Sequence, residues 1–140
     1  MPVHLLKVAV GIAEPAQLAT VQQGRRHLVE GREVVYGYTK RMPTRRDDLI
    51  DGGSIFWVIR HVILVRQPIL DMFMVTDEDG DTYCRLLYDP ELTAVEARPL
   101  RAFQGWRYLD LDAAPRDLGA ASESDLPAHL QQELRALGLL

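Results

Sequence analysis

The sequence contains a single cysteine, Cys84, among its 140 residues. One thiol can form neither an internal disulfide nor a metal cluster held by thiolates alone, and such sparse use of cysteine fits a reducing cytoplasm. No uncharged apolar run approaches the roughly 20 residues that a membrane-spanning helix needs. The opening residues have neither the basic region nor the apolar region of a secretion signal. We therefore predict a cytoplasmic domain that has no membrane partner.

Recognisable catalytic and metal-binding motifs are also missing. The four histidines are scattered without ligand spacing, and there is no nucleophile elbow, phosphate-binding loop or dinucleotide fingerprint. Asp77, Asp79 and Asp81 invite comparison with a calcium loop, but Gly80 falls between the second and third acids. A hairpin turn explains this segment better. We expect no metal and no cofactor, and we predict no catalytic residue.

The composition is that of one globular domain, with 47% hydrophobic and 26% charged residues. A chain of this length usually folds around a single core. We place that domain at residues 1–111. Residues 112–140 are predicted to form a linker and a C-terminal helix that packs on the domain.

Strand signals outnumber helix signals along the chain. Apolar, β-branched and aromatic runs predict strands at 4–11, 34–39, 54–66, 69–76, 82–88, 92–97 and 103–108. Arg60-His61 interrupts the longest run, which leaves one bent strand or two strands open. A first helix is predicted from Glu14 to a C-cap at Gly31, and a short one from an N-cap at Thr44 to Ile50. Too few helices separate the strands for a parallel sheet, so the fold class is α+β, with a mostly antiparallel sheet curled into a small pseudobarrel.

Charge is divided along the chain although the net charge is only −4. Residues 24–66 hold nine cations against five acids, residues 67–97 hold one against eight, and residues 98–107 hold three arginines and no acid. Aromatic residues lie among the cations of the two basic segments. Single-stranded RNA needs cations for its phosphates and flat side chains for its bases. The candidate ligand-binding residues are Tyr38, Lys40, Arg41, Arg45, Arg46, Trp57, Arg101, Trp106 and Arg107.

A more ordinary interpretation of the same residues stays open. The aromatic side chains can serve as core packing, as buried rings do in most small domains. The arginines can pair with the many acids of the neighbouring segments.

Three motifs carry a resemblance to a known family: RMPTRR at 41–46, LIDGGSIFWVI at 49–59 and FQGWRYL at 103–109. On these motifs the chain resembles an uncharacterised bacterial family, domain of unknown function 1489, from its opening residues to about Pro115. That family implies no activity, substrate or catalytic residue. The arrangement of strands around the Gly-Gly pair is also similar to the PUA and ASCH pseudobarrels, which often bind RNA. Architecture of this kind cannot by itself establish a function.

Three functions follow as hypotheses. The first is a small non-catalytic binding domain for RNA or another phosphate-bearing ligand. The second is a protein-interaction or homodimer module, suggested by the apolar residues 55–65 and the leucine-rich tail at 137–140. The third is an enzyme with an unrecognised site that uses His61, Asp47 or Cys84, which requires the fold to gather these residues around one pocket.

Overall fold

The computed structural model describes residues 2–101, 103 and 105–118, which form a sheet of eight strands with few helices. The elements are β1 (His4–Val8), α1 (Pro15–Gln23), β2 (Arg26–Val29), β3 (Arg32–Thr39), α2 (Arg46–Ile50), β4 (Ser54–Ile59), β5 (Val62–Thr76), β6 (Thr82–Tyr88), β7 (Thr93–Pro99), β8 (Trp106–Leu109) and the 3-10 turn η1 (Leu111–Ala113). This mostly β, α+β organisation agrees with the predicted fold class. The predicted C-terminal helix lies outside the described residues.

The strand order is β2-β3-β6-β5-β4-β1-β8, with β7 paired to β5 beside this path. The pairing is antiparallel throughout except between β1 and β4, which run parallel. The sheet is therefore mostly antiparallel, as predicted. Within the described residues it is not closed, since β2 and β8 lie at its two ends.

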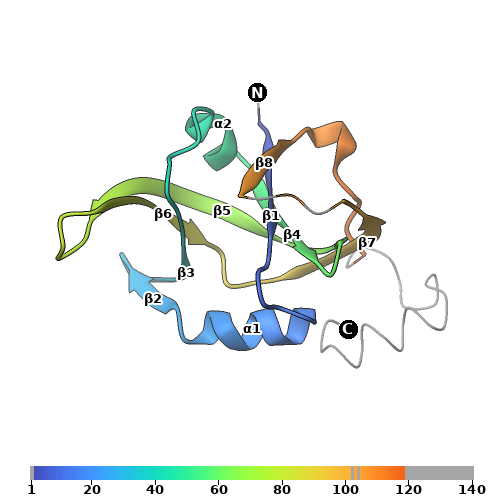
Figure 1. Ribbon diagram of the computed structural model, residues 1–140, viewed down its shortest axis with the longest axis horizontal. Coiled ribbons are helices and arrows are strands. Elements are labelled where there is room, and N and C mark those ends of the chain that lie inside the picture. Colours follow the sequence, from blue (N-terminus) through green and yellow to red (C-terminus); the bar gives the residue numbers. More distant parts are fainter. Residues whose placement is uncertain (1, 102, 104, 119–140) are drawn as a thin grey trace.

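The long strand β5 makes the sheet bend. Its first part, Val62–Arg66, lies between β4 and β7, whereas its second part, Ile69–Thr76, pairs with β6. The register shifts just after Pro68, between Ile69 and Asp71, and such an irregularity is a common place for a strand to change direction. As a result β1 and β3, far apart in the strand order, both cross in front of the β5–β6 ribbon (Figure 1). The Lys7 ammonium bridges them by donating to the Tyr38 carbonyl at 2.8 Å.

The core lies on both sides of β4, all six residues of which are buried. Ile55, Trp57 and Ile59 pack into the larger cluster, inside the curl of the sheet. Phe56 and Val58 point the other way into a smaller cluster. The apolar run that suggested a homodimer therefore lies mainly in the interior, and the tail at 137–140 lies outside the described residues.

The predicted first helix is too long. It ends at Gln23, and the next residues form β2, in which Leu28 is 77% exposed. Gly31 is not a helix C-cap. Glu30 and Gly31 have φ values of +52° and +79° and join β2 to β3, as in the two-residue hairpin turns that match the twist of paired strands.

Other boundaries moved less. The residue that caps α2 is Arg45 rather than Thr44. The run at 54–66 consists of two strands, because Arg60 and His61 have φ values of +51° and +63° and form the turn between β4 and β5. The predicted hairpin at 77–81 is confirmed as the connection between β5 and β6. None of the described helices is long and apolar enough to cross a membrane.

The described residues after η1 pack against the sheet. Asp117 forms a β-bridge with Val95, and its carboxylate accepts two hydrogen bonds from Arg66, both at 2.6 Å. Leu118 is only 6% exposed. This contact fastens the segment to β5 and β7.

Candidate ligand-binding face

Alternation along two neighbouring strands puts a set of aromatic and basic side chains on one face. In β3 and β6 the residues Val35, Cys84 and Leu86 point into the core. The residues between them therefore point outward. The outward residues are Tyr36, Tyr38, Tyr83 and Arg85. Because Tyr38 pairs with Arg85 in the register, the four side chains form one continuous patch.

Arg85 connects the Tyr36 and Tyr83 rings of this patch. Its guanidinium lies 4.5 Å from the centroid of the Tyr36 ring and donates to the Tyr83 hydroxyl at 2.8 Å. Tyr38 meets Tyr83 edge to face at 6.2 Å, and His27 stacks on Tyr36 at 3.9 Å. Tyr38 remains 61% exposed. The result is an open aromatic surface with a cation among its rings.

Two more cations lie beside this surface, at the gap between β1 and β3. Lys7 is partly buried, with its ammonium 5.8 Å from the Tyr38 ring. Burial lowers the pKa of Lys7, and the positive charge of Arg25 acts in the same direction. Within the described part of the chain, no carboxylate forms an ion pair with either residue. An anion brought to this gap would meet two positive charges that are not neutralised.

The surface is hollowed in two adjoining places. An outer groove of about 510 Å³ lies over the aromatic patch, between Arg25, Lys40 and the Asp77 and Asp81 carboxylates of the β5–β6 hairpin. An inner pocket of about 250 Å³ lies between β1, α1 and β3. The two share Arg25, Tyr36, Gly37 and Tyr38 as lining residues. They are thus neighbouring parts of one site, with its acids at one end.

The floor of the inner pocket is a buried polar network. Trp57 donates its indole N–H to Gln67 Oε1 at 2.9 Å, and the amides of Gln67 and Gln22 exchange two hydrogen bonds at 2.7 and 2.8 Å. These bonds connect α1 to β4 and β5. They position the helix as one wall of the pocket.

Tyr88 completes that floor in an unusual way. Its ring is fully buried against Gly37, where a Cβ would lie only 2.5 Å from the ring. Its hydroxyl has no hydrogen-bond partner among the described residues. Burial raises the pKa of this phenol, so Tyr88 stays neutral.

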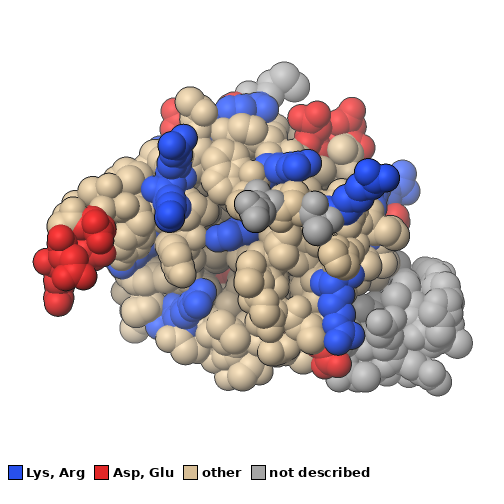
Figure 2. Space-filling view, in the orientation of Figure 1, with Lys and Arg blue, Asp and Glu red and all other residues tan. Residues whose placement is uncertain are grey.

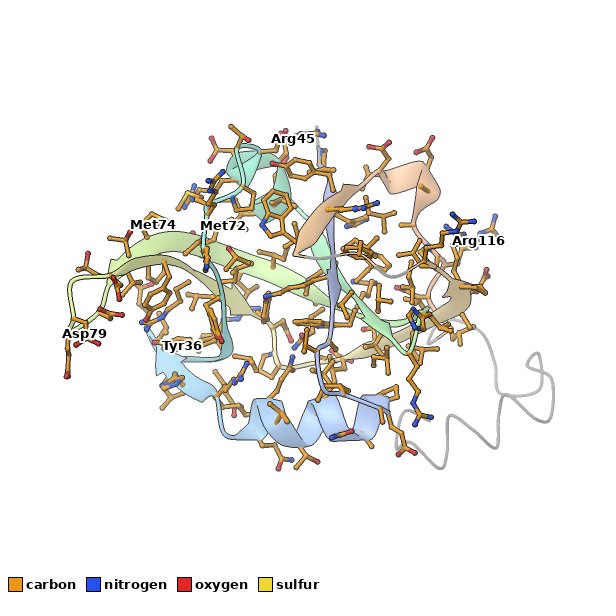
Figure 3. The ribbon with its side chains drawn as sticks, in the orientation of Figure 1. Tyr36, Arg45, Met72, Met74, Asp79 and Arg116 are labelled. Carbon is orange, nitrogen blue, oxygen red and sulfur yellow. The ribbon has the colours of Figure 1, made fainter. Side chains whose placement is uncertain are left out.

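The structure brings together only part of the predicted site. Tyr38 and Lys40 line the outer groove, and Trp57, which is 8% exposed, lies beneath them in the wall of the inner pocket. Arg45 lies at α2, away from Tyr36 (Figure 3), and Arg101 lines a separate hollow beside the β4–β5 turn. The predicted residues therefore do not converge on one surface.

The remaining predicted residues do not line the groove or the inner pocket. Arg45 pairs with Asp48, and Arg46 pairs with Asp47 and Asp71. In the β8 region Arg107 covers the Phe103 ring and Trp106 packs edge to face on Tyr108. Arg101 lines a separate hollow with His61. Arg41 lies just after β3, where its carbonyl accepts from Thr39.

Several residues of the site are absent from the predicted set, among them Lys7, Arg25, His27, Tyr83 and Arg85. A signal existed for two of them. Lys7 is the one charge within the apolar run at 3–10, and Arg85 is the one cation within an acidic segment. Their significance depends on which strands become neighbours, and that information is not local.

The charge distribution agrees with this location. Lysine and arginine side chains are spread over the face that carries β1 and β3, whereas acidic side chains gather toward its edges (Figure 2). One acidic cluster is the tip of the β5–β6 hairpin, where Asp79 lies (Figure 3). An overall negative charge is therefore compatible with a locally basic face.

The residues of the enzyme hypothesis lie apart. His61 is in the β4–β5 turn, and the Asp47 side chain on α2 is 93% exposed. Cys84 is buried in the core, and burial raises the pKa of its thiol, which disfavours a nucleophilic thiolate. Among the described residues, no group of three or more His, Cys, Asp or Glu is placed to hold a metal ion.

A family model described as "Protein of unknown function (DUF1489)" matches residues 5–140. The chain belongs to this family. The resemblance predicted from the three sequence motifs is thereby confirmed. No curated protein and no solved structure matches the chain. Membership of the family brings no ligand or reaction with it, so the function has to be argued from the site.

Proposed function

We propose that this member of the family binds single-stranded RNA in the outer groove. The observation that carries the proposal is the exposed ring of Tyr38, set between Tyr83 and a half-buried Lys7. A large aromatic side chain left 61% exposed beside a second tyrosine ring has the form of a stacking platform. Stacking of one base on such a ring contributes roughly 1–3 kcal/mol.

The cations around the platform fit the phosphates of the same ligand. Lys7, Arg25, Lys40 and Arg85 flank the tyrosines, whereas Asp77 and Asp81 repel phosphate from the hairpin end. The backbone of the RNA is therefore expected to follow the Lys40–Lys7–Arg25 side. Paired bases keep their faces covered by their neighbours, so a groove that offers ring faces favours unpaired nucleotides.

The PUA-like pseudobarrel belongs to the same proposal. The curled but open sheet supports it, because β1 and β3 approach one another across the gap that Lys7 bridges. A cytoplasmic location, where such RNA is present, is proposed with it.

The test is the binding of a fluorescent single-stranded RNA of mixed sequence, followed by anisotropy at 50 and 200 mM salt. With three to four phosphate contacts, affinity is expected to fall about 20- to 50-fold over this range. Tyr38→Ala is expected to weaken binding about fivefold or more, whereas Tyr38→Phe keeps the ring and most of the affinity.

Arg101→Gln supplies the matched control, because it removes one exposed positive charge far from the groove. It is expected to leave the affinity within about twofold of wild type. Absence of binding at 50 mM salt, or equal affinity of Tyr38→Ala and wild type, would reject the proposal.

A further inference from the structure

We infer that the inner pocket receives one nucleotide, with its base between β1 and β3 and its phosphate against Lys7 and Arg25. The nature of the ligand rests on the proposed function. The chemistry recognised is that of a nucleoside monophosphate, either as a unit of RNA or as a free nucleotide.

The dimensions of the pocket suit one flat ring system. Its volume is about 250 Å³, below the roughly 300–1,000 Å³ that encloses drug-sized ligands. It adjoins the outer groove through Gly37 and Tyr38. One nucleotide of an RNA bound in the outer groove could therefore enter the inner pocket while its neighbours stay stacked in the groove.

The walls of the pocket are apolar where a base would lie. Ala9 and Leu18 are buried core residues, Val21 of α1 lies at the surface, and Trp57 closes the floor. Apolar and aromatic walls of this kind contact the two faces of a heterocycle. A small inorganic anion would leave them unused.

The mouth of the pocket has the opposite character. Lys7 donates to the Tyr38 carbonyl, and neither Lys7 nor Arg25 is paired with a carboxylate of the described chain. A partly buried ammonium beside a second cation is electrostatically unfavourable, as the lowered pKa of Lys7 reflects. A phosphate relieves that repulsion, whereas an uncharged apolar ligand would not.

The floor of the pocket also contains a buried polar group without a hydrogen-bond partner in the described part of the chain, which is unusual in a well-packed core. The Tyr88 hydroxyl lacks a partner among the described residues, although the large majority of buried polar groups in proteins have one. Apolar walls, two cations at the mouth and an unsatisfied hydroxyl together describe a binding pocket better than a packing defect.

The experiment titrates the full chain with each of the four nucleoside 5′-monophosphates and follows backbone amide signals by NMR. The parallel titrations use the corresponding nucleosides and inorganic phosphate. At least one monophosphate is expected to shift the signals of Lys7, Ala9 and Gly37, with an affinity about tenfold or more above those of its nucleoside and of phosphate. Equal affinity for monophosphate and phosphate, or for monophosphate and nucleoside, would overturn the inference.

Two substitutions locate the binding. Lys7→Gln is expected to lower monophosphate affinity about tenfold or more, because it removes a charge-assisted contact to phosphate. Val21→Phe places a larger side chain at the surface of α1, where it narrows the entrance of the pocket. This variant is also expected to lower monophosphate affinity about tenfold or more without disturbing the core. The matched controls, Arg101→Gln and Leu28→Phe, change an exposed charge and an exposed apolar residue outside the pocket and should bind as wild type does.

The outcomes separate this inference from the proposed function. If RNA binds with the expected dependence on Tyr38 but no monophosphate binds, and Val21→Phe, which alters only the inner pocket, binds RNA as wild type does, the pocket inference fails and the proposed function stands. If a monophosphate binds in the pocket and RNA does not bind at 50 mM salt, the ligand is a free nucleotide and the RNA proposal fails. If neither binds, both are wrong.

Discussion

Gln67 is the single residue on which the floor of the inner pocket depends. Its Oε1 accepts from Trp57 and Gln22, and its Nε2 donates to the Gln22 amide oxygen and to the Asp89 carbonyl at 3.0 Å. The side chain is 0% exposed, so Gln67 makes these bonds out of contact with solvent. A buried polar group without its partner costs about 1–3 kcal/mol.

We predict that Gln67→Met, which roughly preserves volume, lowers the free energy of unfolding by about 2–4 kcal/mol, because it leaves the Trp57 N–H and the Gln22 amide unpaired. Urea denaturation measures the change. The control is Gln23→Met, which changes the exposed residue that follows Gln22 in α1. Its free energy of unfolding should lie within about 0.5 kcal/mol of that of wild type. A Gln67→Met protein as stable as this control would show that the network contributes nothing.

At the scale of elements, two of the hairpins have two-residue turns in which both residues have positive φ. Glu30-Gly31 joins β2 to β3, and Arg60-His61 joins β4 to β5. The first turn has a glycine, but the second has none. For residues other than glycine, asparagine and aspartate, the left-handed conformation costs roughly 1–2 kcal/mol of free energy per residue. The turn at Arg60-His61 is therefore strained, and the pairing of β4 with β5 offsets this cost.

We predict that the double substitution Arg60→Asn with His61→Gly raises the free energy of unfolding by about 1 kcal/mol, because this pair suits a two-residue turn with positive φ at both positions. Thermal or urea unfolding tests it. The backbone bond from Leu100 N–H to the His61 carbonyl, 2.7 Å long, does not depend on the side chain and should persist. Arg60→Ala with native His61 is the control and should give no gain; a double variant less stable than wild type would contradict the assignment of strain.

At the scale of the whole molecule, a network of charged and polar side chains connects β1 to the last described segment. His4 Nδ1 accepts the Ser54 N–H at 2.9 Å, and Arg66 donates to both Ser54 and Asp117. Burial, and then the charge of Arg66, lower the pKa of His4 below its ordinary value of 6.5. The hydrogen bonds from Arg66 lower the pKa of the Asp117 carboxyl. The fold therefore favours a neutral histidine beside an ionised ion pair.

The sign of the pH dependence follows from these shifts. Below about pH 6.5 the unfolded chain binds a proton at His4 more readily than the folded protein does, so stability is complete above this pH and is lost as the pH falls toward the lowered pKa. Asp117 adds a second loss at more acidic pH, as its carboxylate is protonated. We predict that urea denaturation shows lower stability at pH 5.5 than at pH 7.5.

The variant His4→Gln tests the origin of the first loss. Its side-chain oxygen can still accept the Ser54 N–H but takes up no proton, so the difference in stability between pH 7.5 and 5.5 should shrink. Asp117→Asn should instead flatten the loss at more acidic pH. An unchanged slope in His4→Gln would place the titrating group elsewhere.

The sequence by itself determined the local features of this protein. The hairpin at 77–81, β6 and the mostly antiparallel character follow from turn residues and alternation, which neighbouring residues settle among themselves. The same local patterns misplaced the end of α1, because Leu28 continues the helical spacing although Gly24 stops the helix. Tyr38 and Lys40 were named as site residues from their neighbours in sequence, and their role stays a prediction.

Tertiary structure alone decided which distant residues share a surface. The parallel pairing of β1 with β4 and the bend of β5 bring Lys7 to the Tyr38 carbonyl, 31 positions along the chain. The same pairing buries both faces of β4. The packing of α2 on β5 brings Arg46 to Asp71, 25 positions along the chain. Strand register and sheet curvature depend on contacts between segments far apart in sequence, so no local pattern of charge or aromaticity could specify the groove and pocket that those contacts create.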